Sequence, residues 1–361
     1  MKPLRRRAAA RPIEARARLP YPDGWFAVAF GKELTPGTVL RRRLMGEEIV
    51  VYRTRRGAPL AVRPYCPHLG AHLGVGGKVE GEDLVCPFHS FAFGPDGRCV
   101  RTGYGTPPPK AGLTHLAVRE INGVVAVWHH HAGSPPDWEL PAVPVDRYPA
   151  PVTFAQTIVD HPQEVVENAV DLGHVESVHR FSNARVRKPM RLDGARMSIG
   201  PAVQRILPVL GAIDVEFDVE AHGLGYIVVE ARIPRLRMAA LVQMMATPVD
   251  PAHVEIRFTT AARLGRAGAR DSVAMRASRL LTLALARSFW HDITLDFPIW
   301  QNKVYLPRPR LAQGDGPITP FRRWAAQFYP PGAATPPDQV DPSQQPVADP
   351  GVLESEEEHS R

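Results

Sequence analysis

Two short loops in the first third of the chain carry the strongest chemical pattern. One reads Cys66-Pro67-His68, and after seventeen further residues the other reads Cys86-Pro87-Phe88-His89. Two thiolates and two imidazoles can hold a structural zinc ion tetrahedrally. They can equally hold a [2Fe–2S] cluster in which both Cys bind one iron and both His bind the other. Zinc fingers usually separate their Cys pair from their His pair, whereas each loop here is mixed, which favours the cluster.

A second group of metal-binding side chains lies at residues 167–179, which read Glu-Asn-Ala-Val-Asp-Leu-Gly-His-Val-Glu-Ser-Val-His. On a continuous helix Asp171 and His174 would share a face, although Gly173 weakens the helix here. Two imidazoles, His174 and His179, together with a carboxylate from elsewhere would form the facial triad that binds Fe(II) and leaves positions open for O2. Because such a His pair is by itself as often structural, this interpretation depends on the pattern upstream.

The residues around the first pattern predict a small antiparallel β domain at 21–130. Alternating apolar runs predict strands, at 25–30, 38–44, 48–53, 60–64 and 124–128. Both ligand loops lie between such strands, and Cys99 is expected to be a small core residue near them. His129, His130 and His131 follow a strand end and precede a Pro-rich stretch, so we expect a solvated turn or linker there rather than a metal site. The linker is placed at 131–150.

Residues 151–330 predict a second domain and, with the first, an α+β protein. A strand at 152–159 is followed by a helix at 163–172, which begins near Pro162 and ends before Gly173. Four more strands predict an antiparallel sheet, at 214–220, 226–233, 238–247 and 254–262. One long or two joined helices are expected over 270–303, and a short helix over 320–328. Alternate apolar residues should face a concave side that suits an apolar pocket, among them Ile206, Val209, Leu210, Met238, Leu241, Val242, Met244 and Met245.

Composition and charge narrow the possible classes. The chain has 361 residues and only three Cys, which argues against a disulfide framework and favours a reducing, cytoplasmic location. Much of the net charge of +7 lies in a basic segment at 1–20. No long apolar run follows it, so we expect no transmembrane segment and at most a peripheral contact with an anionic membrane surface. No motif supports nucleic-acid binding, and residues 331–361 predict a disordered acidic tail.

Taken together, the two patterns resemble the catalytic α subunit of the Rieske non-haem iron oxygenases over roughly residues 20–330. The acidic-x3-Asp-x2-His-x4-His element of that family is matched here by Glu167, Asp171, His174 and His179. The resemblance implies a Rieske cluster and a mononuclear iron; the cluster would be bound by Cys66, His68, Cys86 and His89. It also implies a third iron ligand, an Asp on the late helix.

Asp292 and Asp296 are the two candidates for that third ligand. The run from Asp296 to Lys303 resembles the family's Asp-x3-Trp-x-Asn-Lys segment, so the resemblance selects Asp296. Asp292 is then expected to be a solvated or capping acid. Pro298 would kink the helix just after Asp296.

The resemblance has further implications for assembly and electron supply. It implies a helix-grip catalytic domain, in which an antiparallel sheet wraps a long helix. It also implies a homotrimer in which Asp171 joins His174 of one chain to His89 of the next and carries electrons between them. Because the chain has no visible dinucleotide-binding unit, a separate ferredoxin or flavin reductase would supply the electrons of NAD(P)H.

Two C-terminal segments, 296–303 and 321–329, resemble the steroid-acting branch, which includes ketosteroid 9α-hydroxylases and cholesterol 7-desaturases. The expected function is therefore hydroxylation or desaturation, with O2, of a hydrophobic polycyclic substrate, a sterol or steroid. A Rieske oxygenase that hydroxylates or demethylates aromatic compounds is the alternative. Outside the oxygenases, the alternatives are a Rieske electron carrier and a lipid-binding helix-grip module with a structural zinc.

Overall fold

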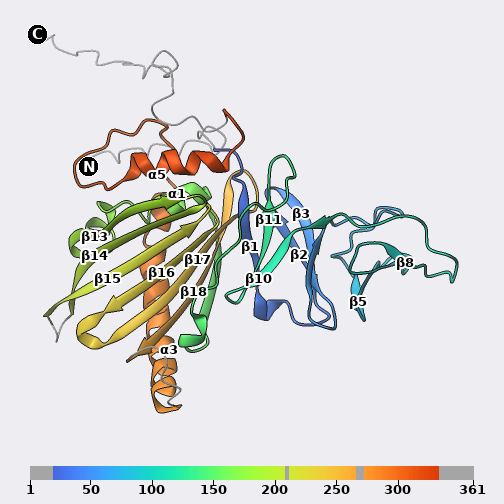
Figure 1. The fold of residues 1–361 in the computed structure, drawn as a ribbon, viewed down its shortest axis with the longest axis horizontal. Helices are drawn as coiled ribbons and strands as arrows, with labels where there is room; N and C mark the ends of the chain where they lie inside the picture. The colour runs from blue at the N-terminus through green and yellow to red at the C-terminus, as the bar shows by residue number, and fades with distance from the viewer. Residues whose placement is uncertain (1–18, 208–210, 266–271, 333–361) are drawn as a thin grey trace, which may run out of the picture.

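The computed structural model of the protein describes residues 19–207, 211–265 and 272–332. The predicted basic segment, except its last two residues, and the predicted acidic tail, except its first two, lie outside these ranges. Figure 1 shows one large curved sheet with a long helix against it and a group of smaller sheets beside it. No helix in the described ranges is long and apolar enough to cross a membrane.

Three small antiparallel sheets form the N-terminal part. The first holds β1 (Gly24–Phe30), β11 (Val124–His129) and β10 (Val118–Ile121); the second holds β2 (Val39–Leu44), β3 (Glu47–Arg53), β4 (Pro59–Val62) and β9 (His115–Leu116); the third holds β5 (Lys78–Glu80), β6 (Asp83–Val85), β7 (Ala92–Phe93) and β8 (Cys99–Arg101). Each pairing follows from short apolar runs and tight turns. Met45 and Gly46, both at positive φ, make the two-residue turn that joins β2 to β3. The ligand loops follow β4 and β6.

A seven-stranded antiparallel sheet dominates the C-terminal part, in the order β12-β18-β17-β16-β15-β14-β13. Its strands are β12 (Val152–Val159), β13 (Ser182–Asp193), β14 (Arg196–Leu207), β15 (Gly211–His222), β16 (Tyr226–Ile233), β17 (Met238–Pro248) and β18 (His253–Leu264). The helix α3 (Ser272–Thr294) lies against β18, where the Thr282 hydroxyl accepts a hydrogen bond from the Ala262 N–H at 2.9 Å. The expected α+β class is confirmed.

The remaining helices are short: α1 (Pro162–Glu167), α2 (His174–Ser177), α4 (Phe297–Trp300) and α5 (Ile318–Ala325), with 3-10 turns η2 (Gly31–Glu33), η3 (Val145–Arg147), η4 (Pro234–Leu236) and η5 (Ala326–Phe328). The helix predicted at 163–172 is wrong in its second half, because α1 ends at Glu167. The stretch predicted as helical over 270–303 is broken between α3 and α4, and Pro298 lies in the first turn of α4. The sequence did not predict β13 and β14; β13 is an edge strand that is mostly exposed and carries five charged residues among its twelve.

The two faces of the large sheet pack against different partners. One face carries Ile199, Val219 and Met244, and it packs with α4 and α5 in the larger core. The opposite face contributes Leu241 and Met245 to a core shared with β1 and β11 of the N-terminal part. Side chains alternate along a strand, so the predicted apolar run of β17 is divided between the two cores.

Candidate metal centres

The two ligand loops have the same backbone geometry. The N–H groups of Cys66 and Cys86 each donate to a carbonyl five residues on, at 2.8 Å, and their carbonyls each accept from an N–H four residues on. Both Cys are buried, whereas His68 and His89 are partly exposed. The pair of loops therefore presents two thiols on the inside and two imidazoles on the outside.

The donor atoms of these loops suit a buried cationic group. The imidazole rings of His68 and His89 lie 4.8 Å apart, and Phe91 stacks on His68 at 4.2 Å. The His89 Nδ1 is buried without a hydrogen-bond partner in the described residues. Burial, followed by the neighbouring Cys86 thiol, raises the pKa of Cys66 to about 11. Buried thiolates require a bound metal to be stable, and Cys99 is buried in the same core as both, as expected.

A second donor group lies inside the C-terminal part. His174, His179 and Asp296 bring ligand atoms within 4.8 Å of one another, and the His179 Nε2 lies 3.4 Å from Asp296 Oδ2. The Nδ1 of His174 lies 2.8 Å from the Asp171 carbonyl oxygen, which can only accept a hydrogen bond. Nδ1 therefore carries the proton, and the unprotonated Nε2 is the atom that would bind a metal.

The local fold explains how two His reach one point. After α1 the chain turns, and the Asp171 carboxylate accepts from the Gly173 and His174 N–H groups at 3.0 and 3.3 Å, which starts α2. Burial alone would raise the pKa of Asp171, but these hydrogen bonds and the His174 ring lower it. Arg180 at φ 56° then turns the chain into β13. His174 thus begins the short helix α2 and His179 follows two residues after its end, so the two do not lie on one continuous helix.

The third donor comes from the break in the late helix. Asp296 lies between α3 and α4, is 2% exposed, and its carbonyl accepts from the N–H groups of Ile299 and Trp300. Asp292 instead forms an ion pair with Arg205 at 3.1 Å. The geometry therefore brings Asp296, and not Asp292, to the two His.

Asn168 belongs to this site and was missed in the sequence. Its side-chain amide donates to Asp296 Oδ2 at 3.2 Å and lies 3.1 Å from the His174 Nε2. Asn168 follows Glu167 directly in the acidic-x3-Asp-x2-His-x4-His element. That position is the only feature of the sequence that could have placed it near the iron ligands. An amide is not a typical iron ligand, so the residue type did not attract attention.

Apolar rings continue from the site onto the concave face of the sheet. The Phe181 ring lies 6.1 Å from His179 and 6.3 Å from Phe217 on β15. Val242 and Met244 face the same core as expected, whereas Ile206 is exposed and Val209 and Leu210 lie outside the described residues. A groove of about 990 Å³, with Arg187, Asp218 and Glu220 in its walls, is also bounded by Val228 and Leu241, so it opens on the other face.

Comparison with known proteins identifies both halves of the chain. Residues 24–115 match the "Rieske [2Fe-2S] domain", and residues 127–329 match the "3-Ketosteroid 9alpha-hydroxylase C-terminal domain". The chain belongs to the Rieske oxygenases with this ketosteroid hydroxylase C-terminal domain.

Relatives of this Rieske oxygenase include sterol-acting enzymes. A cholesterol 7-desaturase of Bombyx mori is 30% identical, over 90% of this chain and 73% of its own. A "Probable 3-ketosteroid-9-alpha-monooxygenase, oxygenase component" of Rhodococcus rhodochrous is 26% identical, over 86% of this chain and 80% of its own. Among solved structures, dicamba monooxygenase bound to 3,6-dichlorosalicylic acid shares the fold, with a TM-score of 0.65, 19% identity, and coverage of 85% of this chain and 96% of its own.

These findings decide between the classes considered above. The donor sets fit the family's [2Fe–2S] cluster and non-haem iron, and the zinc module and the electron carrier are excluded as readings of the whole chain. The aromatic alternative fits less well, because the curated relatives reported above are named for sterols and ketosteroids. Rieske oxygenases work with a separate reductase and ferredoxin.

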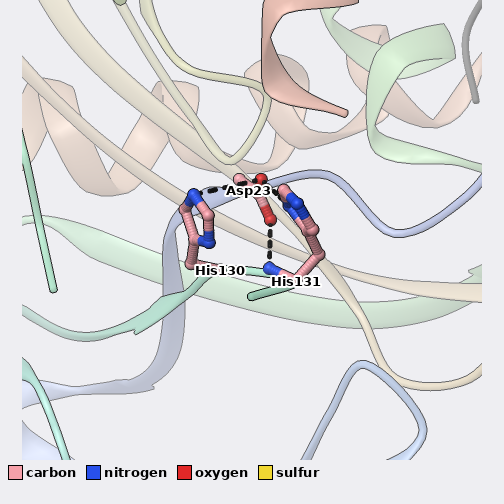
Figure 2. Close-up of side chains that lie close together, drawn as sticks. All are labelled: Asp23, His130 and His131. Carbon is pink, nitrogen blue, oxygen red and sulfur yellow. Dashed lines mark hydrogen bonds and ion pairs between the residues drawn. The ribbon is translucent and has the colours of Figure 1, made fainter. Parts of the chain in front are cut away.

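A third cluster of this Rieske oxygenase corrects the reading of the His tract as a solvated turn. Figure 2 shows Asp23 between His130 and His131. The Asp23 carboxylate accepts from the His131 N–H and from its Nδ1, both at 2.6 Å, and lies 3.7 Å from the His130 Nε2. The Ala132 N–H donates to the His130 Nδ1, so a neutral His130 carries its proton on Nε2, facing Asp23. The polar groups of the cluster are therefore satisfied by hydrogen bonds. The cluster connects the residue before β1 to the residues that follow β11.

Proposed function

We propose that this Rieske oxygenase hydroxylates or desaturates a sterol or steroid, using O2 and electrons of NAD(P)H that a separate reductase delivers. The observation that carries the proposal is the continuity between the donor triad and an apolar surface. Partly buried apolar side chains pack around the core beside the site, among them Phe217, Val229, Val242, Phe289 and Ile293. A large apolar ring system needs such a surface. The named substrates of the relatives point the same way.

Each donor set has an assigned role in this proposal. Cys66, His68, Cys86 and His89 hold the [2Fe–2S] cluster, and His174, His179 and Asp296 hold the mononuclear iron. When bound, the cluster would supply electrons singly and the iron would supply the place where O2 meets the substrate C–H bond.

The protein's own contribution is orientation and exclusion of water. The Asp171 carbonyl holds the His174 ring by its Nδ1–H, and Asn168 holds one oxygen of Asp296. The Phe181 and Phe217 rings keep water away from the substrate side and place the substrate against the triad. We propose a Rieske domain at 21–130, a linker at 131–150, a catalytic domain at 151–330 and a cytoplasmic location.

A homotrimer accounts for the distance between the two centres. Figure 1 shows the sheet of β5 and β8, which lies beside the cluster loops, at the right-hand end of the molecule, away from α1. Large apolar side chains surround His68 and His89 and are 58–65% exposed: Tyr65, Leu69, Phe88 and Tyr104. The Asp171 side chain is 37% exposed. We infer that the cluster face of one chain meets the Asp171 region of another, so that Asp171 joins His89 to His174 across the interface.

Metal analysis and product analysis of the full chain test the proposal. Anaerobically purified protein should hold about three irons per chain, two in the cluster and one mononuclear. The reduced protein, given O2 and a panel of sterols, ketosteroids and aromatic acids, should convert a sterol or steroid, read by mass spectrometry. Turnover of the aromatic acids alone would contradict the substrate class.

Size and electron transfer test the assembly separately. Light scattering should give a mass of three chains. In Asp171→Asn both metal centres should stay loaded, while reoxidation of the reduced cluster by O2 and substrate slows by orders of magnitude. A monomeric protein with unchanged reoxidation in this variant would contradict the interface.

A further inference from the structure

A buried polar seam joins α1 to the end of the described chain. All six residues of α1 are buried. Three of them are polar, and because they are spaced three and four residues apart they share one face: Gln163, Glu164 and Glu167. Their partners all come from residues 303–329: Lys303, Tyr305, Arg322 and Tyr329.

The strongest contact of the seam is a two-pronged ion pair. The Glu167 carboxylate accepts from Arg322 Nε at 2.6 Å and from Nη2 at 2.8 Å. The third nitrogen of Arg322, Nη1, donates to the Leu306 carbonyl, and the guanidinium lies 4.7 Å over the Tyr305 ring. Both side chains are under 10% exposed. This planar fork fixes the distance and the rotation of α1 relative to α5, as a point charge would not.

A second ion pair connects α1 to the residues that follow α4. Lys303, at the end of the segment that begins with Asp296, lies 3.0 Å from Glu164. Burial raises the pKa of Glu164, which Lys303 opposes. Each buried acid thus has one cation, and α1 is held between the segment after Asp296 and the helix α5.

The seam continues into the loop that carries the donor residues. The Leu172 N–H donates to the Asp315 carbonyl at 3.1 Å. A Cβ at Gly316 would lie 2.1 Å from the Val170 carbonyl oxygen, so only Gly fits there. The segment before α5 therefore packs directly against residues 170–172, between Asn168 and His174.

We propose that Arg322, acting through Glu167, is a positioning residue for the mononuclear iron site. Asn168 follows Glu167 directly, donates to Asp296 Oδ2, and lies 3.1 Å from the His174 Nε2 that would bind the metal. A displacement of α1 would therefore reach two of the three donors. α5, which lies next to α1 (Figure 1), then acts as a clamp on the iron site although it supplies no ligand. The inference rests on the proposed iron site and adds the residues that hold its geometry.

The alternative role, stability alone, makes a different prediction. Replacing both partners of a buried ion pair by apolar residues often leaves stability unchanged. Removing only one partner is strongly destabilising, because the other charge stays buried without a counter-charge. Arg322→Met should therefore destabilise the fold, and Glu167→Leu with Arg322→Met should recover most of that stability. The apolar pair lacks the directional fork, so it should not recover the iron-site geometry.

The test measures metal affinity and does not depend on turnover. The full chain with its cluster is stripped of mononuclear iron by a chelator and titrated with Co²⁺. Arg322→Met and the apolar double variant should both bind Co²⁺ about 10- to 100-fold more weakly than wild type. The matched control is Arg53→Met, which breaks the Arg53–Glu120 fork, with both contacts at 2.7 Å, in the Rieske part. It should lose stability and keep the Co²⁺ affinity.

Two outcomes would overturn the inference. One is a double variant that regains the wild-type Co²⁺ affinity together with its stability, since the pair would then be structural only. The other is Arg53→Met weakening Co²⁺ binding as much as Arg322→Met, since the effect would then follow stability in general. If wild type binds no Co²⁺ beyond the cluster, the proposed iron site itself fails, and that result is distinct from both.

Discussion

The side-chain amide of Asn168 donates a hydrogen bond to Asp296 Oδ2 at 3.2 Å, across 128 residues of sequence. It also points an N–H at the His174 Nε2, from 3.1 Å. One neutral side chain thus orients the proposed ligand Asp296 and lies directly beside the nitrogen of His174 that would bind the metal. This relationship identifies the residue whose loss should harm the iron site without removing a ligand.

Asn168→Ala should weaken mononuclear iron binding by about tenfold or more, because orienting partners of metal ligands contribute on that scale. The cluster should be unaffected, since no contact links Asn168 to its loops in the described residues. Iron content and the visible spectrum of the cluster check this, with Gln204→Ala on the exposed part of β14 as control. Full iron occupancy in Asn168→Ala would contradict the role.

His174→Ala and Cys86→Ser should separate the two centres. The first variant should lose the mononuclear iron and turnover but retain the cluster spectrum. The second should lose the cluster because its thiolate ligand is gone. Metal content and spectra of both variants measure this, and product formation by His174→Ala would show that the site is wrongly assigned.

Phe217→Ala should reduce kcat/KM for a sterol substrate. Burying an aromatic side chain against an apolar ligand contributes about 1.5–3 kcal/mol, roughly 10- to 100-fold in kcat/KM. Leu192→Ala, on the exposed edge strand β13, is the control. An equal loss of kcat/KM in both variants, or no loss in Phe217→Ala, would show that Phe217 does not contact the substrate.

His161 should make the fold sensitive to mild acid. Its Nδ1 accepts from the Gln163 N–H at 3.2 Å and its Nε2 lies 3.1 Å from the Pro20 carbonyl, so the buried ring is held neutral at the start of α1. Burial lowers the pKa of His161 to about 4. The unfolded chain therefore takes up a proton first, near pH 6.5, and stability is lost as the pH falls from there toward 4, by about 2 kcal/mol at pH 5.

His161→Asn keeps a capping side chain and removes this titration. Denaturant unfolding at pH 7 and pH 5 should show a smaller difference for the variant than for wild type. Equal differences would mean that His161 does not control the acid response.

Asp23→Ala should destabilise the fold by about 1–3 kcal/mol, because the N–H donors of His131 would lose their buried acceptor. Thermal unfolding measures the effect. Zn²⁺ should not stabilise wild type more than Asp23→Ala, since the cluster is satisfied without a metal. A zinc-dependent rise in Tm found only in wild type would contradict the hydrogen-bonded interpretation.

Local patterns in the sequence were sufficient to predict the cluster loops and several of the strands. The Cys66-to-His68 and Cys86-to-His89 loops identify a cluster domain because the ligands of each loop are close in sequence. Strands β1, β3, β16 and β18 followed from their alternation, within two residues at each end. The strand β13 did not, since its exposed, charged residues carry no apolar period.

Residue types and spacing by themselves determined which side chains could bind metals and that α and β elements would be mixed. Only the tertiary structure decided which other distant groups meet: that Asn168 lies between two proposed ligands, that Arg322 holds Glu167, and that Asp23 joins the His tract. The physical reason is that spacing along one element constrains neighbours within a turn or two. Contacts across more than a hundred residues depend on how the sheet, α3 and the C-terminal segment pack together.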